Sequence, residues 1–439
     1  MTKQPATARL GSMGLWYITP RPEGWKDCRL RFLSRVNPPY KVALPPATEV
    51  SFVPMAAVGE HGGIQIDQVK LLGEVGDGYT PFRDGDVVIA KITPCFENGK
   101  GAIAEGLTSG VAFGTTELHV VRPGEQLDRR FLYYLTASDL FRELGEGAMY
   151  GAGGQKRVPE QFIKDFRITL PSLPAQRKVA DLLERKTAEI DTLIEKKRRL
   201  LDLLAEKRTA LITRTVTKGL DADVPMKDSG IEWLGDIPAH WDVARLKNIA
   251  QLESGHTPSK SKPEFWVNCD IPWVSLRDTK ALADNDYIGQ THTHINRAGL
   301  EGSSARLLPA GTVIFTRDAT VGLAAITEEE MAVSQHLIAW IPSERVDKEY
   351  LLFVFEAMRE YLHSLEFGST VRTIGMDDIR RLVGPVPPLT EQLKIVDYFL
   401  TERGGLTELE TRINEAIEKL KEYRSALITN AVTGQIKVA

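Results

Sequence analysis

Polar side chains gather beside two short apolar runs, and their types suit contacts with nucleic acid. The runs are residues 87–90 and 313–315, and each follows a turn that contains glycine. Cationic donors mixed with threonine, serine, asparagine and glutamine can reach phosphate oxygens and base edges. The candidate DNA-contacting residues are Lys91, Thr93, Asn98, Lys100, Gln155, Lys156 and Arg157 in the first half of the chain, and Ser259, Lys260, Lys262, Arg317, Asp318, Thr320, Arg372 and Thr373 in the second.

A second pattern, Asn37-Pro38-Pro39-Tyr40, suggests catalysis instead. The tetrapeptide resembles the catalytic loop of amino-methyltransferases, which holds the target amine of adenine or cytosine. Such enzymes also need a glycine-rich strand–turn–helix for S-adenosylmethionine. The Gly-Ala-Gly-Gly of residues 151–154 follows no apolar strand, and the matching part of the second half, residues 253–256, keeps no such motif. We therefore expect a proline-rich turn, with an adenine-N6 methyltransferase as the alternative.

Other catalytic patterns are weak. His292-Thr293-His294 has no acidic or cysteine ligand at zinc spacing, so a polar loop is expected and no metal site is predicted. The sequence contains no Gly-x-Ser-x-Gly elbow and no Walker-type phosphate loop. We expect a chain without catalytic activity of its own.

Length and composition predict a multidomain globular protein. The chain has 439 residues, 42% of them hydrophobic and 26% charged, which favours two or three domains. No apolar run approaches the ~20 residues of a membrane helix, no signal peptide is recognisable, and three scattered cysteines suit a reducing cytoplasm. The net charge of −4 argues mildly against a nucleic-acid binder, but residues 155–178 carry six basic and two acidic side chains.

The chain repeats itself at a spacing of 216 residues. Ala-Leu-Ile-Thr occurs at residues 210–213 and again at 426–429, and the same spacing links Gln176 to Gln392 without a gap. Trp25 and Trp241 repeat at this spacing too. A register kept this long indicates one structural plan built twice.

Each repeat ends in a predicted long helix, at residues 173–220 and 388–439. Pro174 suits a first helical turn. Gly404-Gly405 interrupts the second helix and predicts a local weak point or kink. Apolar residues at steps of three, four and seven predict a coiled-coil seam, antiparallel if a two-fold axis relates the halves. The predicted seam consists of Leu183, Ile190, Leu193, Leu200, Leu204 and Leu211 in the first helix, and Phe399, Leu406, Leu409, Ile413, Leu420 and Leu427 in the second.

The helices follow two divergent domains, residues 1–172 and 221–387. Each has the turn and apolar strand described above and a later helical pattern, at residues 131–144 in the first and from residue 350 in the second. The predicted fold class is α+β: two tandem mixed α/β domains, each followed by a long helix, with the helices packed as an antiparallel coiled coil in pseudo-two-fold symmetry.

Two divergent domains, each followed by a similar helix that has proline shortly before its repeated glutamine and carries Ala-Leu-Ile-Thr, resemble the specificity subunit of Type I restriction–modification systems. The resemblance covers essentially the whole chain. It implies that each domain is a target-recognition domain for one half of a bipartite, asymmetric sequence in double-stranded DNA. It also implies that the helices are a spacer that docks two modification subunits and two restriction subunits. S-adenosylmethionine, ATP and Mg²⁺ would bind to those partners, and this chain would carry no cofactor.

Three hypotheses remain open at this point. The doubled plan favours a DNA-recognition subunit, and Asn37-Pro38-Pro39-Tyr40 favours a methyltransferase. The acidic net charge favours a coiled-coil scaffold that contacts protein only.

Overall fold

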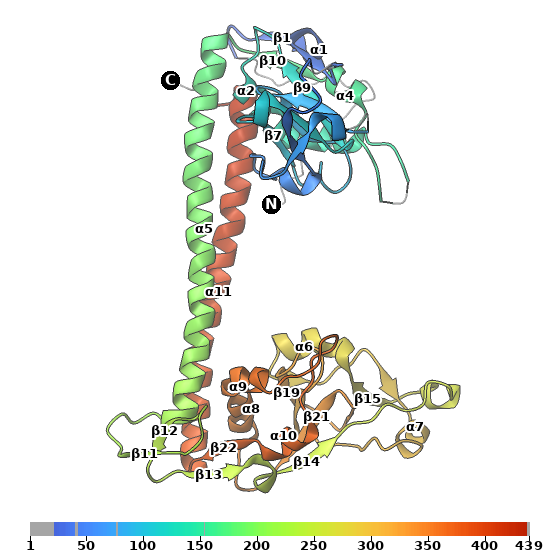
Figure 1. Cartoon of the computed structure of the whole chain (residues 1–439). Helices are drawn as coiled ribbons and strands as arrows, with labels where there is room; N and C mark the ends of the chain where they lie inside the picture. Colours follow the sequence, from blue (N-terminus) through green and yellow to red (C-terminus); the bar gives the residue numbers. More distant parts are fainter. Residues whose placement is uncertain (1–21, 40–42, 76–77, 153, 437–439) are drawn as a thin grey trace, which may run out of the picture. The chain divides into compact units, whose positions relative to one another are not determined.

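The structure is a computed structural model that describes residues 22–39, 43–75, 78–152 and 154–436. It divides into two compact units (Figure 1). The first unit runs to Lys197 and resumes at Asn414, and the second is Arg198–Ile413. Each of the two long helices, α5 (Leu173–Lys218) and α11 (Leu389–Val432), contributes one part to each unit.

The domain of the first unit contains two four-stranded sheets and a two-stranded ribbon, in the orders β2-β9-β6-β7, β4-β3-β8-β5 and β1-β10. Its strands are β1 (Lys26–Arg29), β2 (Ser34–Val36), β3 (Glu49–Val53), β4 (Val69–Leu71), β5 (Thr80–Arg83), β6 (Val87–Ala90), β7 (Gly101–Ile103), β8 (Val111–Gly114), β9 (Leu118–Pro123) and β10 (Arg167–Leu170). Its short helices are α1 (Leu30–Leu33), α2 (Arg129–Ala137), α3 (Asp139–Gly147) and α4 (Glu160–Asp165).

The domain of the second unit repeats this plan around a five-stranded sheet in the order β14-β21-β18-β19-β16, beside a three-stranded sheet β17-β15-β20 and ribbons β13-β22 and β11-β12. Its strands are β11 (Met226–Asp228), β12 (Asp236–Pro238), β13 (Asp242–Arg245), β14 (Ala250–Ser254), β15 (Ile271–Val274), β16 (Tyr287–Ile288), β17 (His294–Ile295), β18 (Val313–Thr316), β19 (Ala324–Thr327), β20 (Ala332–Val333), β21 (Leu337–Pro342) and β22 (Val383–Val386). Its short helices are α6 (Thr279–Asp284), α7 (Arg297–Glu301), α8 (Lys348–Ala357), α9 (Arg359–Ser364) and α10 (Met376–Arg381).

The central strands are the two apolar runs noted in the sequence. All four residues of β6 and all four of β18 are buried, which confirms both predicted strands. β6 pairs antiparallel with β7 and β9, and β18 pairs in the same way with β19 and β21. The two domains therefore share a core of the same topology.

The helix predicted at residues 131–144 is two helices. Ser138 has an extended backbone (φ −70°, ψ 148°), and its hydroxyl accepts a hydrogen bond from Phe141 N. Because that hydroxyl caps α3, the chain leaves α2 and starts a new helix at the next residue. Apolar spacing alone does not distinguish this break from one continuous helix.

A repeated glutamine fastens each domain to the start of a long helix. The side chain of Gln176 accepts from Asp128 N at 2.8 Å and donates to Gln126 O at 2.9 Å and Pro171 O at 3.0 Å. Gln392 repeats the arrangement with the backbone of Asp347, Arg345 and Pro387, at 2.8, 3.0 and 2.9 Å. Both glutamines are fully buried. The repeated residue therefore closes a structural joint in each unit.

The repeated tryptophans pack on the C-terminal ends of the long helices. A Cβ on Gly219, just past α5, would lie 3.0 Å from Trp241, and one on Gly434, just past α11, would lie 3.1 Å from Trp25. Both glycines have positive φ, 71° and 73°, as helix-ending glycines commonly do. In the first unit Trp25 thus meets the end of α11, and in the second Trp241 meets the end of α5.

The buried stripes of the helices correct part of the predicted seam. Leu183, Ile190, Leu204, Phe399, Leu406, Ile413 and Leu427 are buried as predicted, and Leu211 and Leu420 are half-buried. Leu193, Leu200 and Leu409 are 43%, 41% and 41% exposed, so they lie outside the buried stripe. The heptad instead runs through Ile194, which is buried, and through Leu201 and Glu410, which are half-buried, because its steps alternate strictly between three and four residues.

The corrected seam predicts a contrast between neighbouring residues. Ile194→Ala should lower the free energy of unfolding by about 2–4 kcal/mol, because it removes a side chain that is 7% exposed and leaves a cavity. Leu193→Ala, the matched control one position away, should cost less than about 1 kcal/mol because its side chain is already hydrated. Urea unfolding followed by circular dichroism measures both, and equal losses would contradict the corrected seam.

The predicted break at Gly404-Gly405 is absent. Helix α11 is continuous through both residues, which are exposed. No atom outside the helix backbone lies within 4 Å of a Cβ built on either one. The cost of glycine in a helix is only about 1 kcal/mol per residue, which the buried residues on either side, such as Phe399 and Leu406, offset.

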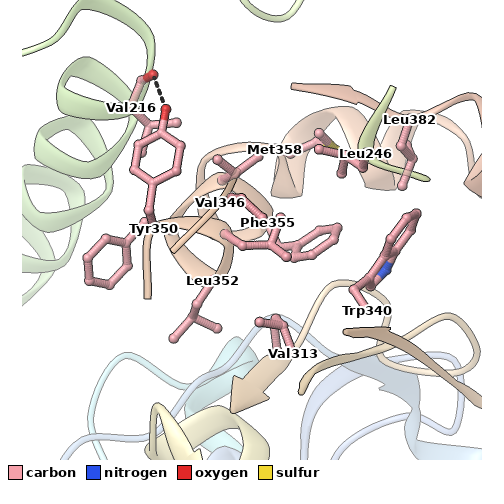
Figure 2. Close-up of a cluster of buried hydrophobic side chains, with 14 of the residues drawn as sticks. Val216, Leu246, Val313, Trp340, Val346, Tyr350, Leu352, Phe355, Met358 and Leu382 are labelled. Atoms are coloured by element: carbon pink, nitrogen blue, oxygen red, sulfur yellow. Dashed lines mark hydrogen bonds between the residues drawn. The ribbon is translucent and has the colours of Figure 1, made fainter. Parts of the chain in front are cut away.

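The largest core cluster joins the second domain to both long helices. It includes Ile212 and Val216 of α5, Phe399 of α11 and most of α8. Figure 2 shows Phe355 of α8 beside Trp340 of the sheet, and the Tyr350 hydroxyl donating to Val216 O at 3.4 Å. Burial of this hydroxyl raises the pKa of Tyr350.

Within the described ranges, none of the helices combines the length and apolarity that a membrane crossing requires.

Candidate nucleic-acid interface

The segment that follows β6 is fixed by backbone hydrogen bonds to two distant parts of the first domain. Lys91 N donates to Glu117 O at 2.9 Å, just before β9. Val158 N donates to Lys91 O at 2.8 Å, and Thr93 N donates to Lys156 O at 3.0 Å. This pairing places five polar residues at one strand end: Lys91, Thr93, Glu117, Lys156 and Arg157.

The second domain has the same set of bonds after β18. Arg317 N donates to His336 O at 2.9 Å, just before β21. Ile374 N donates to Arg317 O at 3.0 Å, and Ala319 N donates to Arg372 O at 2.9 Å. The backbone is therefore equivalent in the two domains, with Arg317 in the place of Lys91 and His336 in the place of Glu117.

A short hairpin completes both strand ends. Tyr150 and Arg157 exchange two backbone hydrogen bonds, at 3.1 and 2.9 Å, and Phe367 and Thr373 exchange two at 3.0 Å. The glycine after each aromatic residue has positive φ, 127° at Gly151 and 104° at Gly368. Tyr150 and Phe367 are 64% and 57% exposed. Each domain thus presents an exposed aromatic ring beside its polar strand end.

In the first domain an ion pair occupies the strand end. The Arg157 guanidinium binds Glu117 through two hydrogen bonds, Nε to Oε2 at 2.9 Å and Nη2 to Oε1 at 2.8 Å. The bond from Arg157 lowers the pKa of the Glu117 carboxyl. Both ends of this bidentate pair remain partly exposed, so the Arg157 fork is held in a fixed direction.

In the second domain a carboxylate occupies the same place. Asp318 Oδ2 lies 2.7 Å from His336 Nδ1, and its Oδ1 accepts from the Thr373 hydroxyl and from Arg317 Nε. Burial raises the pKa of Asp318, but the bonds from Thr373 and His336 outweigh it, so that the carboxyl titrates below its ordinary range. Asp318 is therefore an anion that orients three neighbouring donors. Identical backbones thus carry different polar patterns.

The remaining candidates lie outside these two strand ends or point elsewhere. Lys100 Nζ donates inward to Met55 O at 3.3 Å, and Asn98 donates to Glu60 at 3.1 Å. Thr320 is exposed, and its carbonyl accepts from the Thr316 hydroxyl.

The other candidates of the second domain are divided between two loops. Arg372 pairs with Glu366 at 3.3 Å, next to the strand end, and the pKa of Glu366 is lowered chiefly by His363. Ser259, Lys260 and Lys262 lie on a separate loop, where Ser259 bonds Ser261 at 2.8 Å. In the first domain, the last candidate, Gln155, is exposed on the hairpin that Tyr150 and Arg157 close.

Sequence reasoning missed Glu117 and His336. Each is the residue just before a long strand, β9 or β21, and is far in sequence from the residues it meets. The sheet register alone brings them to the end of β6 or β18. The only sequence signal was a polar residue directly before an apolar strand.

Asn37 of the methyltransferase-like tetrapeptide has a structural role. Its amide Oδ1 accepts from Val120 N at 2.9 Å, and its Nδ2 lies 3.0 Å from His119 Nδ1 and 2.9 Å from Glu160 Oε2. His119 Nε2 lies 2.9 Å from Val158 O, and burial lowers the pKa of this imidazole. The Asn37 amide is thus occupied by protein partners. Tyr40 lies outside the described residues.

The histidines of the sequence His292-Thr293-His294 lie in a polar loop and a short strand, β17. His292 Nδ1 lies 2.9 Å from Asp278 Oδ1. Among the described residues, no group of three or more histidine, cysteine, aspartate or glutamate side chains is placed to hold a metal ion.

A family model for the Type I restriction modification DNA specificity domain matches the chain twice, at residues 38–202 and 238–419. The chain belongs to the Type I DNA specificity family. Both matches contain one strand-end cluster and part of a long helix, so the family unit is the domain together with its helix. This confirms the resemblance inferred from the repeat.

Two specificity subunits are similar over part of their length. That of the Type I restriction enzyme EcoEI of Escherichia coli is 41% identical over 160 residues, which cover 36% of this chain and 27% of the relative. That of MjaIX of Methanocaldococcus jannaschii is 32% identical over 192 residues, 43% of each chain. The matched part therefore spans less than half of each relative.

A solved chain from a study of complex assembly and conformational transition in the type I R-M system has the same fold. The similarity covers 95% of this chain and 99% of that chain, with a TM-score of 0.68 and 22% sequence identity.

Proposed function

We propose that this protein is the DNA-recognition subunit of a Type I restriction–modification complex, and that each domain reads one half of a bipartite, asymmetric site. The observation that carries the proposal is the pair of strand ends. Their backbones make the same hydrogen bonds, while Arg157 and Glu117 in one are replaced by Thr373 and His336 in the other. A constant scaffold with variable donors and acceptors suits the reading of two different base sequences.

The candidate contacts divide into reading and positioning groups. Arg157, Arg317, Thr373 and the hairpin residues Gln155, Lys156 and Arg372 belong to the strand ends, where fixed donors suit base edges. Lys91, Thr93 and Thr320 beside the strand ends, and Ser259, Lys260 and Lys262 on their separate loop, suit phosphate contacts. Lys100 and Asn98 make intramolecular bonds and take a supporting role.

The long helices are the spacer between the readers in this proposal, packed as an antiparallel coiled coil with pseudo-two-fold symmetry. Three observations support it. Both helices carry a buried heptad stripe. In the first unit Arg424 of α11 binds Asp191 of α5, with Nε to Oδ1 at 2.9 Å, and in the second unit the Tyr350 hydroxyl near the α11 start binds Val216 at the α5 end. The start of each helix thus shares a unit with the end of the other.

Chemistry belongs to the partners in this proposal. Two modification subunits dock on the helices and bind S-adenosylmethionine, and two restriction subunits supply ATP- and Mg²⁺-dependent cleavage, all in the cytoplasm. The net charge of this chain is −4. In this proposal the chain shares its DNA interface with the partners, whose basic surfaces supply much of the counterion release that favours binding.

A domain exchange tests the proposal. Residues 1–172 are replaced by the corresponding domain of a relative with a known target, and the methylated sequence of the host genome is mapped. We expect one half of the motif to change and the other to stay. A change in both halves, or in neither, would contradict one reader per domain.

Two further measurements separate the alternative functions. A protein-only scaffold would give no sequence-dependent gel shift when the chain is mixed with its modification partner. A methyltransferase acting through Asn37 would bind S-adenosylmethionine as the isolated chain, and calorimetry should detect no such binding.

A further inference from the structure

The second domain contains a cleft that its strand-end cluster does not explain. Its volume is about 890 Å³. It lies between the loop of residues 257–267, strand β15 and the turn that precedes β21. The residues that line it include Trp266, Trp273, Lys260, Arg277, Ser334 and His336.

Two indole rings form one wall of the cleft. Trp266 and Trp273 stand edge to face, with ring centroids 5.8 Å apart and an interplanar angle of 81°. Trp266 Nε1 donates to Ser259 O and Trp273 Nε1 donates to His256 O, each at 3.2 Å. Because both indole N–H groups already have backbone partners, the rings contribute apolar surface to the cleft. Such surface suits stacking against a planar group.

Ser334 adds a polar group to this apolar wall. It is 1% exposed, and among the described residues its hydroxyl has no hydrogen-bond partner. A buried hydroxyl without a partner destabilises the fold. Ser334 lines the cleft, where a bound group with a donor or acceptor at its edge would satisfy the hydroxyl.

Cationic side chains line the same cleft. Among the described residues, Lys260 and Arg277 have no ion-pair partner, so their charge is available to an anionic ligand. His336 lies on the cleft and also faces Asp318 at 2.7 Å. The cleft is therefore continuous with the strand-end cluster of the second domain.

We propose that this cleft receives one base turned out of the duplex in the second half-site. The inference rests on the proposed DNA-recognition function and deepens it. A base that remains stacked offers only its edge to protein, which side-chain tips can read. A cleft with an aromatic wall, an unpartnered buried hydroxyl and cations for the flanking phosphates fits the face, edge and backbone of an unstacked nucleotide. In this arrangement the base stacks on Trp266 and its polar edge meets Ser334.

A mismatch scan tests the proposal on the full chain assembled with its modification partner. At each position of the second half-site, the opposing base is replaced so that the scanned base keeps its identity but loses its pair. Unpairing a base costs a few kcal/mol, so a mismatch at the extruded position should tighten binding by roughly tenfold. Methyltransferases turn their own target base out of the duplex, so a mismatch at a methylated base in either half-site should also tighten binding, without dependence on Trp266. Mismatches at the other positions should weaken binding or leave it unchanged.

Two variants assign the effect to the cleft. Trp266→Ala should abolish the tightening, because it removes the stacking surface. Trp266→Phe should keep it, because phenylalanine retains an aromatic face although it loses the bond to Ser259. If both variants lose the tightening equally, the loop bond and not stacking is responsible, and the proposal fails.

The scan separates this inference from the proposed function. Sequence-specific binding with no position in the second half-site whose tightening depends on Trp266 overturns the base-receiving cleft and leaves DNA recognition intact. Absence of any sequence-specific binding overturns both. A tightened position that depends on the aromatic face of Trp266 supports both.

Discussion

Gln176→Ala is expected to lower the free energy of unfolding by about 3 kcal/mol, and Gln392→Ala by a similar amount. Each glutamine is fully buried and makes three hydrogen bonds to backbone groups of its domain. A hydrogen bond contributes about 1 kcal/mol net, and the groups left unpaired add to the loss. The repeated glutamine is thus predicted to be the strongest single joint between a domain and its helix.

Urea unfolding of the single and double variants measures this effect. Because the two sites lie in different compact units and share no partner, their losses should add within about 0.5 kcal/mol. Gln161→Ala is the matched control: its amide is exposed and bonds one neighbouring carboxylate, so its loss should stay below about 1 kcal/mol. Losses of that size at Gln176 and Gln392 would refute the joint.

The sequence repeat predicted the joint residues but not their role. The 216-residue spacing marked Gln176, Gln392, Trp25 and Trp241 as equivalent. Repetition carries no information on contacts, and the partners of these residues are backbone atoms and helix-ending glycines, which have no distinctive side chain. The long helices and the central strands could be predicted because their signals are local and periodic.

The errors in the seam have a definite physical origin. Leu193 and Leu200 follow Ile190 at steps of three and seven residues, whereas the strict three-and-four alternation continues from Ile190 through Ile194, Lys197 and Leu201. Lysine and arginine can occupy a buried stripe by covering it with their aliphatic stems. An assignment that accepts only apolar residues therefore fails where a seam position is polar.

The candidate site was only partly predictable, because sheet register assembles it. Lys91 and Arg317 follow apolar strands and were found for that reason. Glu117 and His336 directly precede neighbouring strands, and Asp318 meets His336 only because β18 and β21 are aligned as they are. Of the residues that differ between the two clusters, Arg157 and Thr373 were predicted from the sequence, whereas no local pattern marks Glu117 and His336.

The pair of clusters predicts that single substitutions alter one half-site only. Asp318→Asn should weaken binding to the second half-site by about 10- to 100-fold, which corresponds to about 1–3 kcal/mol for a mispositioned base contact. The substitution removes the anion that orients Arg317, His336 and Thr373 and leaves the backbone hydrogen bonds in place.

Glu117→Gln is the matched control in the first domain. It releases Arg157 from its bidentate pair and should affect only the first half-site. Binding of the assembled complex to duplexes that carry either half-site unchanged and the other scrambled measures both effects. Because the two clusters lie in different compact units, each variant should lose discrimination in one half and keep it in the other. A uniform loss across both halves would instead mean that these carboxylates stabilise the fold or hold phosphates, and that the bases are read elsewhere.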